Sequence, residues 1–283
     1  MEMIRAVAEL RAEGDRARAE GSLVGLVPTM GALHEGHASL IRRARQECRA
    51  VIVSIFVNPL QFGSGDELRS YPRDEARDLR VCEGLGVDLV FAPSAGAMYP
   101  EGEPTVALDP GPLGRRLEGA SRPGHFRGVL TVVAKLFHAA GPCRAYFGEK
   151  DAQQLFLVRR MVRELDFPVQ VVACPTVREA DGLARSSRNV LLSAQERQAA
   201  GCLFLALSEA AELSRSGERD GGRIVAVMAR EVGATPLARL DYAAVVDEDT
   251  FEEVRRAEGS MRALVAARFG AVRLIDTLRL PTR

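Results

Sequence analysis

Short apolar runs alternate with helix-like segments through the first 174 residues of the chain. The apolar runs, predicted as strands, are residues 23–27, 50–57, 87–91, 144–147 and 169–173. The segments predicted as helices lie between them, at residues 38–45, 74–82, 128–140 and 152–165. Strands joined by helices pair in parallel, and buried parallel strands are apolar throughout. This part is therefore predicted to be an α/β, Rossmann-like doubly wound parallel sheet, whose ligands collect beyond the carboxyl ends of the strands.

The character of the sequence changes near residue 174. A polar, glycine-containing stretch covers residues 175–189, and an alanine-rich helix is predicted from residue 193 to about 214. A second helix at 222–232 and extended stretches at 241–246, 261–267 and 272–280 follow. We therefore expect two domains: a catalytic domain at residues 1–174 and a small α+β domain at 175–283, with 175–189 as the hinge. At the N-terminus, residues 1–10 are predicted as an amphipathic helix that lacks the apolar core of a signal peptide.

The composition excludes several classes of function. The chain has 283 residues with 38 basic and 38 acidic side chains, a balance that argues against a surface built to bind nucleic acid. Its five cysteines are far apart and form no Cys-x-x-Cys pair, so disulfides and a cysteine-rich zinc site are not expected. No apolar run approaches membrane-spanning length. A cytoplasmic protein that acts on small charged molecules, with neither nucleic acid nor membrane as partner, is expected.

Two histidines mark the junction between the first predicted strand and the helix after it. The junction, residues 28–37, reads Pro-Thr-Met-Gly-Ala-Leu-His-Glu-Gly-His, with His34 and His37 near one face of the first helical turn. The unpaired amides and the positive dipole of a helix start favour an anion, and imidazoles add donors. This pattern predicts a cradle for nucleotide phosphates. Ordinary helix-start histidines are the competing interpretation.

Four further segments extend the pattern in order, at residues 54–62, 122–129, 147–154 and 177–189. With these five segments the chain resembles the pantothenate synthetase family, a nucleotidyltransferase group with a core like that of class I aminoacyl-tRNA synthetases. The resemblance implies ATP-dependent condensation of (R)-pantoate with β-alanine to give pantothenate, AMP and pyrophosphate through a pantoyl-adenylate, a step toward coenzyme A. It also implies Mg²⁺ and a homodimer.

The resemblance assigns catalytic roles to His34, His37 and Lys150. Lys150 is expected on the α-phosphate and Asp151 beside Mg²⁺, although a solvated ion pair is the competing interpretation of these two. Residues 186–188 are expected to clamp the outer phosphates; Arg185 stands where family members often have an apolar residue. The full set implied to bind ATP is Met30, Gly31, Ala32, Leu33, His34, Glu35, Gly36, His37, Gly148, Glu149, Lys150, Asp151, Val177, Arg185, Ser186, Ser187 and Arg188.

Two glutamines are implied to bind pantoate. Gln61 and Gln154 would hold its hydroxyl and carboxylate groups through neutral hydrogen bonds that leave the carboxylate nucleophilic. Asn58, Arg122 and His125 are further candidates for the same pocket, with loop packing as the alternative for the last two. Residues 61–67 form a glycine-hinged, charged stretch that is either a surface loop or, as we favour, a lid that shields an adenylate from water.

Two other functions fit parts of this pattern. A cytidylyl- or adenylyltransferase would stop at nucleotide transfer and release a stable nucleotidyl product instead of AMP. A silent nucleotide-binding or assembly protein would release no pyrophosphate, and the set of Lys150, Ser186, Ser187 and Arg188 argues against it. The neutral charge balance disfavours a tRNA-charging enzyme.

Overall fold

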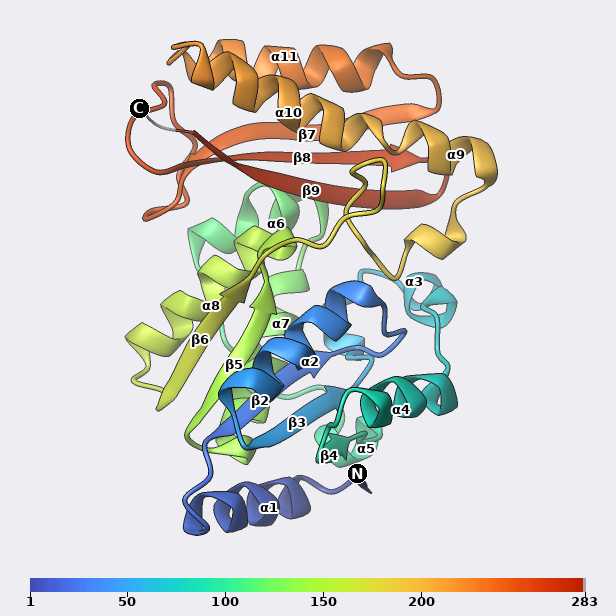
Figure 1. Cartoon of the computed structure of the whole chain (residues 1–283), viewed down its shortest axis with the longest axis vertical. Helices are drawn as coiled ribbons and strands as arrows, with labels where there is room; N and C mark the ends of the chain where they lie inside the picture. Colours follow the sequence, from blue (N-terminus) through green and yellow to red (C-terminus); the bar gives the residue numbers. More distant parts are fainter. Residues whose placement is uncertain (282–283) are drawn as a thin grey trace. The chain divides into compact units, whose positions relative to one another are not determined.

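The computed structural model describes residues 1–281, which form two compact units. Unit 1 comprises Met1–Gly148 and Gln154–Pro175, and unit 2 comprises Glu149–Gln153 and the chain from Thr176 onward. Figure 1 follows the chain through both units. Thr282 and Arg283, the last residues of the expected second domain, lie outside the described residues.

Unit 1 is built on one parallel sheet of six strands, in the order β1-β4-β3-β2-β5-β6. Every pair of neighbouring strands in this sheet is parallel. The strands are β1 (Glu2–Ile4), β2 (Val24–Thr29), β3 (Ala50–Ile55), β4 (Leu89–Phe91), β5 (Cys143–Gly148) and β6 (Val169–Cys174). The predicted doubly wound α/β fold is confirmed.

Helices cover both faces of this sheet. Side chains of α1 (Val7–Ala19), α7 (His125–Ala140) and α8 (Ala152–Glu164) form the core on one face, and those of α2 (Glu35–Glu47) and α4 (Glu75–Gly84) form the core on the other. Strand residues alternate between the two cores: in β3, Ile52 belongs to the first, and Val51 and Val53 belong to the second. Burial on both sides explains why the strands are mostly apolar.

The sheet changes its winding direction at β2. From β2 the strand order runs through β3 and β4 on one side and through β5 and β6 on the other. β2 pairs with β3 along all of its residues, but with β5 only at Gly25 and Leu26. The carboxyl end of β2 is therefore a topological switch point, where ligands bind in sheets of this kind. The histidine motif begins there.

Short helical segments connect the main elements of unit 1. None was expected from the sequence, because segments this short show no apolar period. Polar caps start three of them: Asn58, Ser64 and Ser94 each accept a hydrogen bond from a main-chain amide two or three residues further on. The segments are η1 (Pro59–Gln61), α3 (Gly65–Ser70), α5 (Ala95–Met98), η2 (Pro112–Arg115) and α6 (Glu118–Ser121).

Two predicted helices differ from the structure. The helix expected at residues 1–10 was wrong: β1 pairs in parallel with β4, and α1 begins only at Val7. Pairing with a distant strand decides the conformation of this segment, and local periodicity cannot show it. The helix expected at 193–214 is two helices, α9 (Ala194–Ala199) and α10 (Cys202–Arg215), separated at Ala200 and Gly201.

Unit 2 contains the expected small α+β fold. Its three antiparallel strands, β7 (Ala238–Asp247), β8 (Met261–Phe269) and β9 (Val272–Leu280), lie in that order. Helices α10 and α11 (Gly221–Ala234) pack on the sheet, as Figure 1 shows. They share one apolar core with it. Unit 2 also contains η3 (Glu149–Asp151) and η4 (Asn189–Leu191). No helix among residues 1–281 combines the length and hydropathy needed to cross a membrane.

Candidate functional site

The main chain turns sharply after β2. The Thr29 hydroxyl donates to the Ser54 carbonyl at 2.7 Å and accepts from the Gly31 amide at 3.1 Å. Gly31 has φ of 77°, and a Cβ at this position would lie 2.9 Å from an Asp78 oxygen. Only glycine fits this combination of left-handed backbone and close approach.

A buried carboxylate holds the loop that follows. Asp78 accepts hydrogen bonds from the Ala32 and Leu33 amides, both at 2.8 Å, and its side chain is almost fully buried. Burial raises the pKa of the Asp78 carboxyl, and the two amide hydrogen bonds oppose that rise. Ala32 has φ of 49°, in the left-handed region, which is unfavourable for alanine. The two hydrogen bonds to Asp78 maintain this conformation. Asp78 was not named from the sequence. The signal that could have found it is its spacing: an acidic residue one helical turn before the apolar Cys82 lies on the buried face of α4.

His34 and His37 cap the start of α2 reciprocally. The Gly36 amide donates to His34 Nδ1 at 3.1 Å, and the His34 amide donates to His37 Nδ1 at 3.4 Å. The ring centroids are 4.1 Å apart. Because each Nδ1 accepts a hydrogen bond, each neutral ring carries its proton on Nε2. The two histidines thus combine a structural cap with two N–H donors at a helix N-terminus, an arrangement suited to phosphate oxygens.

Gln61 and Asn58 are buried next to the histidine motif. Asn58 Nδ2 donates to Gln61 Oε1 at 3.0 Å, and Gln61 Nε2 lies 3.0 Å from Met30 Sδ. Both amides are buried, although amides are usually exposed. The structure therefore brings three residues expected in the site, Met30, Asn58 and Gln61, into direct contact.

Arg122 and His125 contact the main chain of Gln61. His125 Nδ1 lies 2.9 Å from the Gln61 carbonyl and Arg122 Nη2 lies 3.3 Å from it. Since a carbonyl only accepts, His125 carries its proton on Nδ1, and its Nε2 accepts from Arg122 Nη1 at 3.1 Å. Arg122 also pairs with Glu67 of α3 at 3.2 Å. These contacts tie both residues to Gln61 and to the predicted lid; direct contact with substrate stays a prediction.

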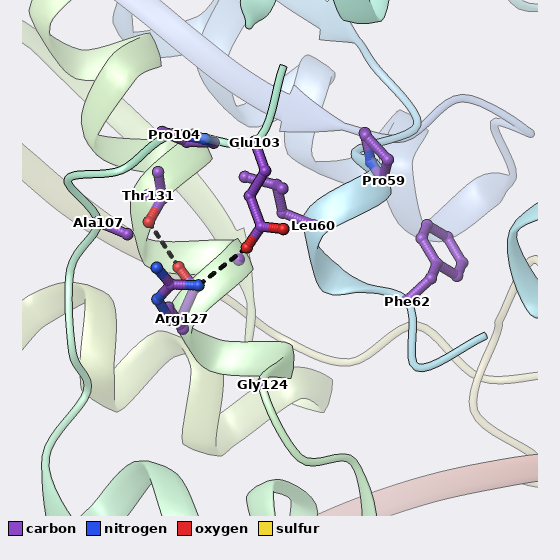
Figure 2. A pocket seen from close by; sticks show the side chains of 10 residues that line it. Pro59, Leu60, Phe62, Glu103, Pro104, Ala107, Gly124, Arg127 and Thr131 are labelled. Atoms are coloured by element: carbon purple, nitrogen blue, oxygen red, sulfur yellow. Dashed lines mark hydrogen bonds and ion pairs between the residues drawn. The ribbon is translucent and has the colours of Figure 1, made fainter. Parts of the chain in front are cut away.

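Two cavities adjoin this region of unit 1. One, of about 260 Å³, is lined by Met30, Gly31 and Ala32, by the end of β3 and by the start of α4, including Asp78. The other, of about 270 Å³, lies between η1 and α7 and is shown in Figure 2. In that second cavity Arg127 pairs with Glu103 at 3.2 Å and Thr131 donates to the Arg127 carbonyl at 2.7 Å. Its charged groups are paired with each other, and only the first cavity is lined by the histidine motif.

The Gly-Glu-Lys-Asp segment begins at the end of β5, and its charged residues belong to unit 2. Lys150 Nζ lies 3.6 Å from Asp151 Oδ1; the lysine side chain is mostly buried, whereas 46% of the aspartate side chain is exposed. Glu149 pairs with the buried Arg262 of β8 at 3.2 Å. Glu149 therefore anchors the segment to the sheet of unit 2. Gly148 and Gln154 belong to unit 1, Gln154 half-buried in the first turn of α8.

The predicted phosphate clamp follows a small ordered turn. Arg178 and Ala184 form an antiparallel bridge, and Arg178 pairs with the buried Asp276 of β9 at 2.6 Å. The Arg185 amide donates to the Val177 carbonyl at 2.9 Å, and the Arg185 guanidinium pairs with Glu179 at 3.0 Å. This pair gives Arg185 a structural contact that the sequence did not indicate.

Residues 186–189 form a tight turn. The Arg188 amide lies 3.3 Å from Ser186 Oγ, and the Asn189 amide donates to the Ser186 carbonyl at 3.0 Å. Ser187 and Arg188 are half-buried. Serine hydroxyls, main-chain amides and a guanidinium thus occur together over three consecutive residues, which is the chemistry that phosphate oxygens require.

The carboxylate of Asp151 has the chemistry of a ligand for a magnesium ion that is bound together with a nucleotide. Within residues 1–281 no group of three histidine, cysteine or acidic side chains could hold a metal ion by itself. Mg²⁺ is commonly held by one or two carboxylates together with substrate phosphates, so a single carboxylate such as Asp151 matches that chemistry.

A doubly wound parallel sheet with a histidine-capped helix at its switch strand defines a nucleotide-binding enzyme of the Rossmann-like class. Residues 2–279 match the sequence model of a family described as pantoate-beta-alanine ligase. The chain belongs to this family and is a ligase.

Individual relatives match this chain over nearly its whole length. Pantothenate synthetase of Rubrobacter xylanophilus is 53% identical over 286 residues, which cover 99% of this chain and 98% of that protein. The crystal structure of pantothenate synthetase from Thermus thermophilus has 49% identity and a TM-score of 0.91, and the match covers 99% of this chain and 100% of that one. Pantoate-beta-alanine ligase from Francisella tularensis, crystallised with beta-gamma ATP and beta-alanine, has 33% identity and a TM-score of 0.79, with 98% and 97% covered.

Proposed function

We propose that the chain condenses (R)-pantoate with β-alanine at the expense of ATP, through a pantoyl-adenylate. In the first step a pantoate carboxylate oxygen attacks the α-phosphorus, and the bond from that phosphorus to the pyrophosphate oxygen breaks. In the second step the neutral amine of β-alanine attacks the acyl carbon, AMP leaves, and the nitrogen loses a proton. The family match over residues 2–279 supports this reaction.

The observation that carries this mechanism is the pair of histidines that cap the start of α2. Nδ1 of His34 and Nδ1 of His37 each accept a hydrogen bond from a main-chain amide, so each neutral ring holds its proton on Nε2. In the proposed mechanism these two N–H groups donate to ATP phosphate oxygens beside the amides of the α2 N-terminus. Donors held in place before the reaction stabilise developing charge without reorganisation.

Lys150 is assigned to the α-phosphate in the proposed mechanism. Its compact ammonium offsets the negative charge that builds up as pyrophosphate leaves. Ser186, Ser187 and Arg188 hold the β- and γ-phosphates, because two hydroxyls and a forked guanidinium match phosphate oxygens. Asp151 would hold the Mg²⁺ of the Mg·ATP substrate, and that ion would offset the negative charge of the phosphates.

Gln61 and Gln154 hold pantoate, with Asn58 supporting Gln61. A neutral amide orients the carboxylate by hydrogen bonds and leaves its charge available for attack. Residues 61–67 act as a lid over the adenylate, which water would otherwise hydrolyse. The contact between Arg122 and Glu67 supports this role, because it connects the lid to the residue that holds Gln61.

Product analysis with purified protein tests the function. We expect pantothenate, AMP and pyrophosphate in equal amounts when pantoate, β-alanine and Mg·ATP are all present. A stable nucleotidyl product, or ADP and phosphate, would contradict the reaction. The same preparation in light scattering and size-exclusion chromatography tests the proposed homodimer. Microscopy of a tagged chain in its native cell tests the proposed cytoplasmic location.

A further inference from the structure

A chain of hydrogen bonds in unit 1 leads from Tyr99 to Gln61. The Tyr99 hydroxyl donates to Asn58 Oδ1 at 2.8 Å, and Asn58 Nδ2 donates to Gln61 Oε1 at 3.0 Å. All three side chains are buried, with exposed fractions of 6%, 1% and 8% in that order. Tyr99 lies at the carboxyl end of α5, about forty residues along the chain from the two amides. The family resemblance assigned no role to Tyr99.

The orientation of the Asn58 amide is determined by its main-chain neighbours. Its Nδ2 lies 3.1 Å from the Gly128 carbonyl, which can only accept, so this atom must be the nitrogen. Its Oδ1 accepts from the Leu60 amide at 3.3 Å, which can only donate. Both hydrogens of Nδ2 are then used, one by Gly128 and the other by Gln61. The amide of Asn58 therefore cannot turn over without losing these bonds.

This orientation determines the orientation of Gln61 as well. Since Asn58 presents an N–H, the Gln61 atom that faces it must be the oxygen, and Gln61 Nε2 points away from Asn58. There it lies 3.0 Å from Met30 Sδ, a weak acceptor that belongs to the histidine motif. An incoming oxygen is a stronger acceptor than a thioether and would replace it. Gln61 is thus held as a hydrogen-bond donor.

We propose that Tyr99 is a positioning residue: its hydrogen bond holds the Asn58 side chain, whose orientation the main chain sets, in place against Gln61, so that Gln61 stays a donor and selects a substrate acceptor oxygen. With pantoate as the substrate, the inference rests on the proposed function, and the oxygen belongs to the carboxylate or the hydroxyl group. Tyr99 itself does not touch the substrate in this arrangement.

The surroundings of Tyr99 suit this role. Its ring packs against Phe56 with centroids 6.0 Å apart, and Lys135 Nζ lies 5.7 Å from the ring centroid. Burial raises the pKa of the Tyr99 hydroxyl, so it stays a donor across the working pH range. On the other side, a Cβ at Gly128 would lie 2.3 Å from the Leu60 carbonyl, so only glycine lets α7 approach η1 closely enough for the Asn58 bond.

Steady-state kinetics of Tyr99→Phe test the inference, because phenylalanine keeps the ring and removes only the hydroxyl. We expect the KM for pantoate to rise about tenfold, in line with the loss of one buried hydrogen bond, and the KM for ATP to stay within about twofold. Tyr146→Phe is the matched control: it removes another buried hydroxyl of unit 1, bonded to Glu47, and should leave the pantoate KM unchanged. An unchanged pantoate KM in Tyr99→Phe, or equal changes for both substrates, overturns the positioning role.

A double-mutant cycle separates action through Gln61 from a general packing effect. If Tyr99 acts through Gln61, Tyr99→Phe adds less than about twofold to the pantoate KM once Gln61→Ala is present. The same tenfold rise in both backgrounds overturns the inference. Wild-type protein in the same assay tests the proposed function by itself: without turnover of pantoate both proposals fail, whereas turnover with additive effects refutes only the role of Tyr99.

Gln61→Glu tests the donor assignment without touching Tyr99. A glutamate has nearly the same size, and at an assay pH high enough to ionise a buried carboxyl it only accepts hydrogen bonds. One carboxylate oxygen can still accept from Asn58. The other faces the substrate oxygen, and because both are acceptors no hydrogen bond forms between them. We expect the pantoate KM to rise at least as much as in Gln61→Ala. A glutamate variant with nearly wild-type KM overturns the assignment.

Discussion

The Asp78 carboxylate holds the main chain at Ala32, whose amide donates to Asp78 Oδ2 at 2.8 Å. This bond joins α4 to the loop that leads into the histidine motif. The Leu33 amide makes the second bond to the same carboxylate, directly before His34. The position of the first histidine therefore depends on an acid that is distant in the sequence.

Asp78→Asn should disturb this loop. Asparagine keeps the size of the side chain but turns one acceptor into an N–H group that faces a main-chain amide. We expect the free energy of unfolding to fall by about 1–3 kcal/mol and adenylate formation to slow by about tenfold. Urea unfolding and single-turnover kinetics measure the two effects. Asp109→Asn is the control, because Asp109 also accepts from a main-chain amide, that of Gly111, in an exposed loop. Wild-type adenylate formation in Asp78→Asn would contradict the role of Asp78.

The two functions of His34 can be separated by substitution. Asparagine caps helices well and can replace Nδ1 as acceptor from the Gly36 amide, but it has no counterpart of Nε2. We expect His34→Asn to unfold with nearly the wild-type free energy, and His34→Ala to lose about 1 kcal/mol. Both should slow adenylate formation about a hundredfold, because both lack the phosphate donor. An active His34→Asn protein would show that the cap alone matters.

Lys150 is one of only two lysines in a chain with 36 arginines. Lys150→Ala should slow adenylate formation by about 10²–10³-fold, as expected for loss of one preorganised charge at the α-phosphate. Lys150→Arg keeps the charge but not the compact ammonium, so its rate should lie between those of the wild type and Lys150→Ala. Arg256→Ala removes an exposed positive charge from unit 2 and serves as the control. An unchanged single-turnover rate in Lys150→Ala would remove this residue from the mechanism.

Buried thiols should be inert in the folded protein. Burial raises the pKa of Cys82 and Cys143 to about 12 and that of Cys202 to about 11. Thiolates react and thiols do not, so we expect these three cysteines to resist alkylation at pH 8 until the protein is unfolded. Mass spectrometry of iodoacetamide-treated protein, with and without guanidinium, measures this. Modification of any of the three in native protein at the rate of a free thiol would contradict their burial.

The sequence predicted those elements of the fold that local patterns determine. β2 to β6 are apolar because both faces of the sheet are covered, and the main helices show their apolar period. β1 was missed because three residues become a strand only by pairing with β4. The break at Gly201 was missed although a glycine marks it, because residues on both sides have helical composition and a single glycine is tolerated inside many helices.

The candidate site was predictable where motifs carry the chemistry. The histidine motif was named from its residues and Asn58 and Gln61 from the family resemblance, and the structure brings Met30, Asn58 and Gln61 together; their contact with substrate stays a prediction. Asp78 and Tyr99 were not named, because each acts through hydrogen bonds to residues about forty positions away. Sequence spacing does not show such contacts; a buried polar residue on an apolar helix face is their only local sign.

The fate of the pantoate oxygens tests the proposed mechanism most directly. With both carboxylate oxygens of pantoate labelled with ¹⁸O, attack on the α-phosphorus places one labelled oxygen between the acyl group and AMP. The amine of β-alanine then breaks the bond from the acyl carbon to that oxygen, so the label leaves with AMP. Mass spectrometry should find one ¹⁸O in each AMP and none in pyrophosphate. Unlabelled AMP, or label in phosphate or pyrophosphate, would contradict the adenylate mechanism.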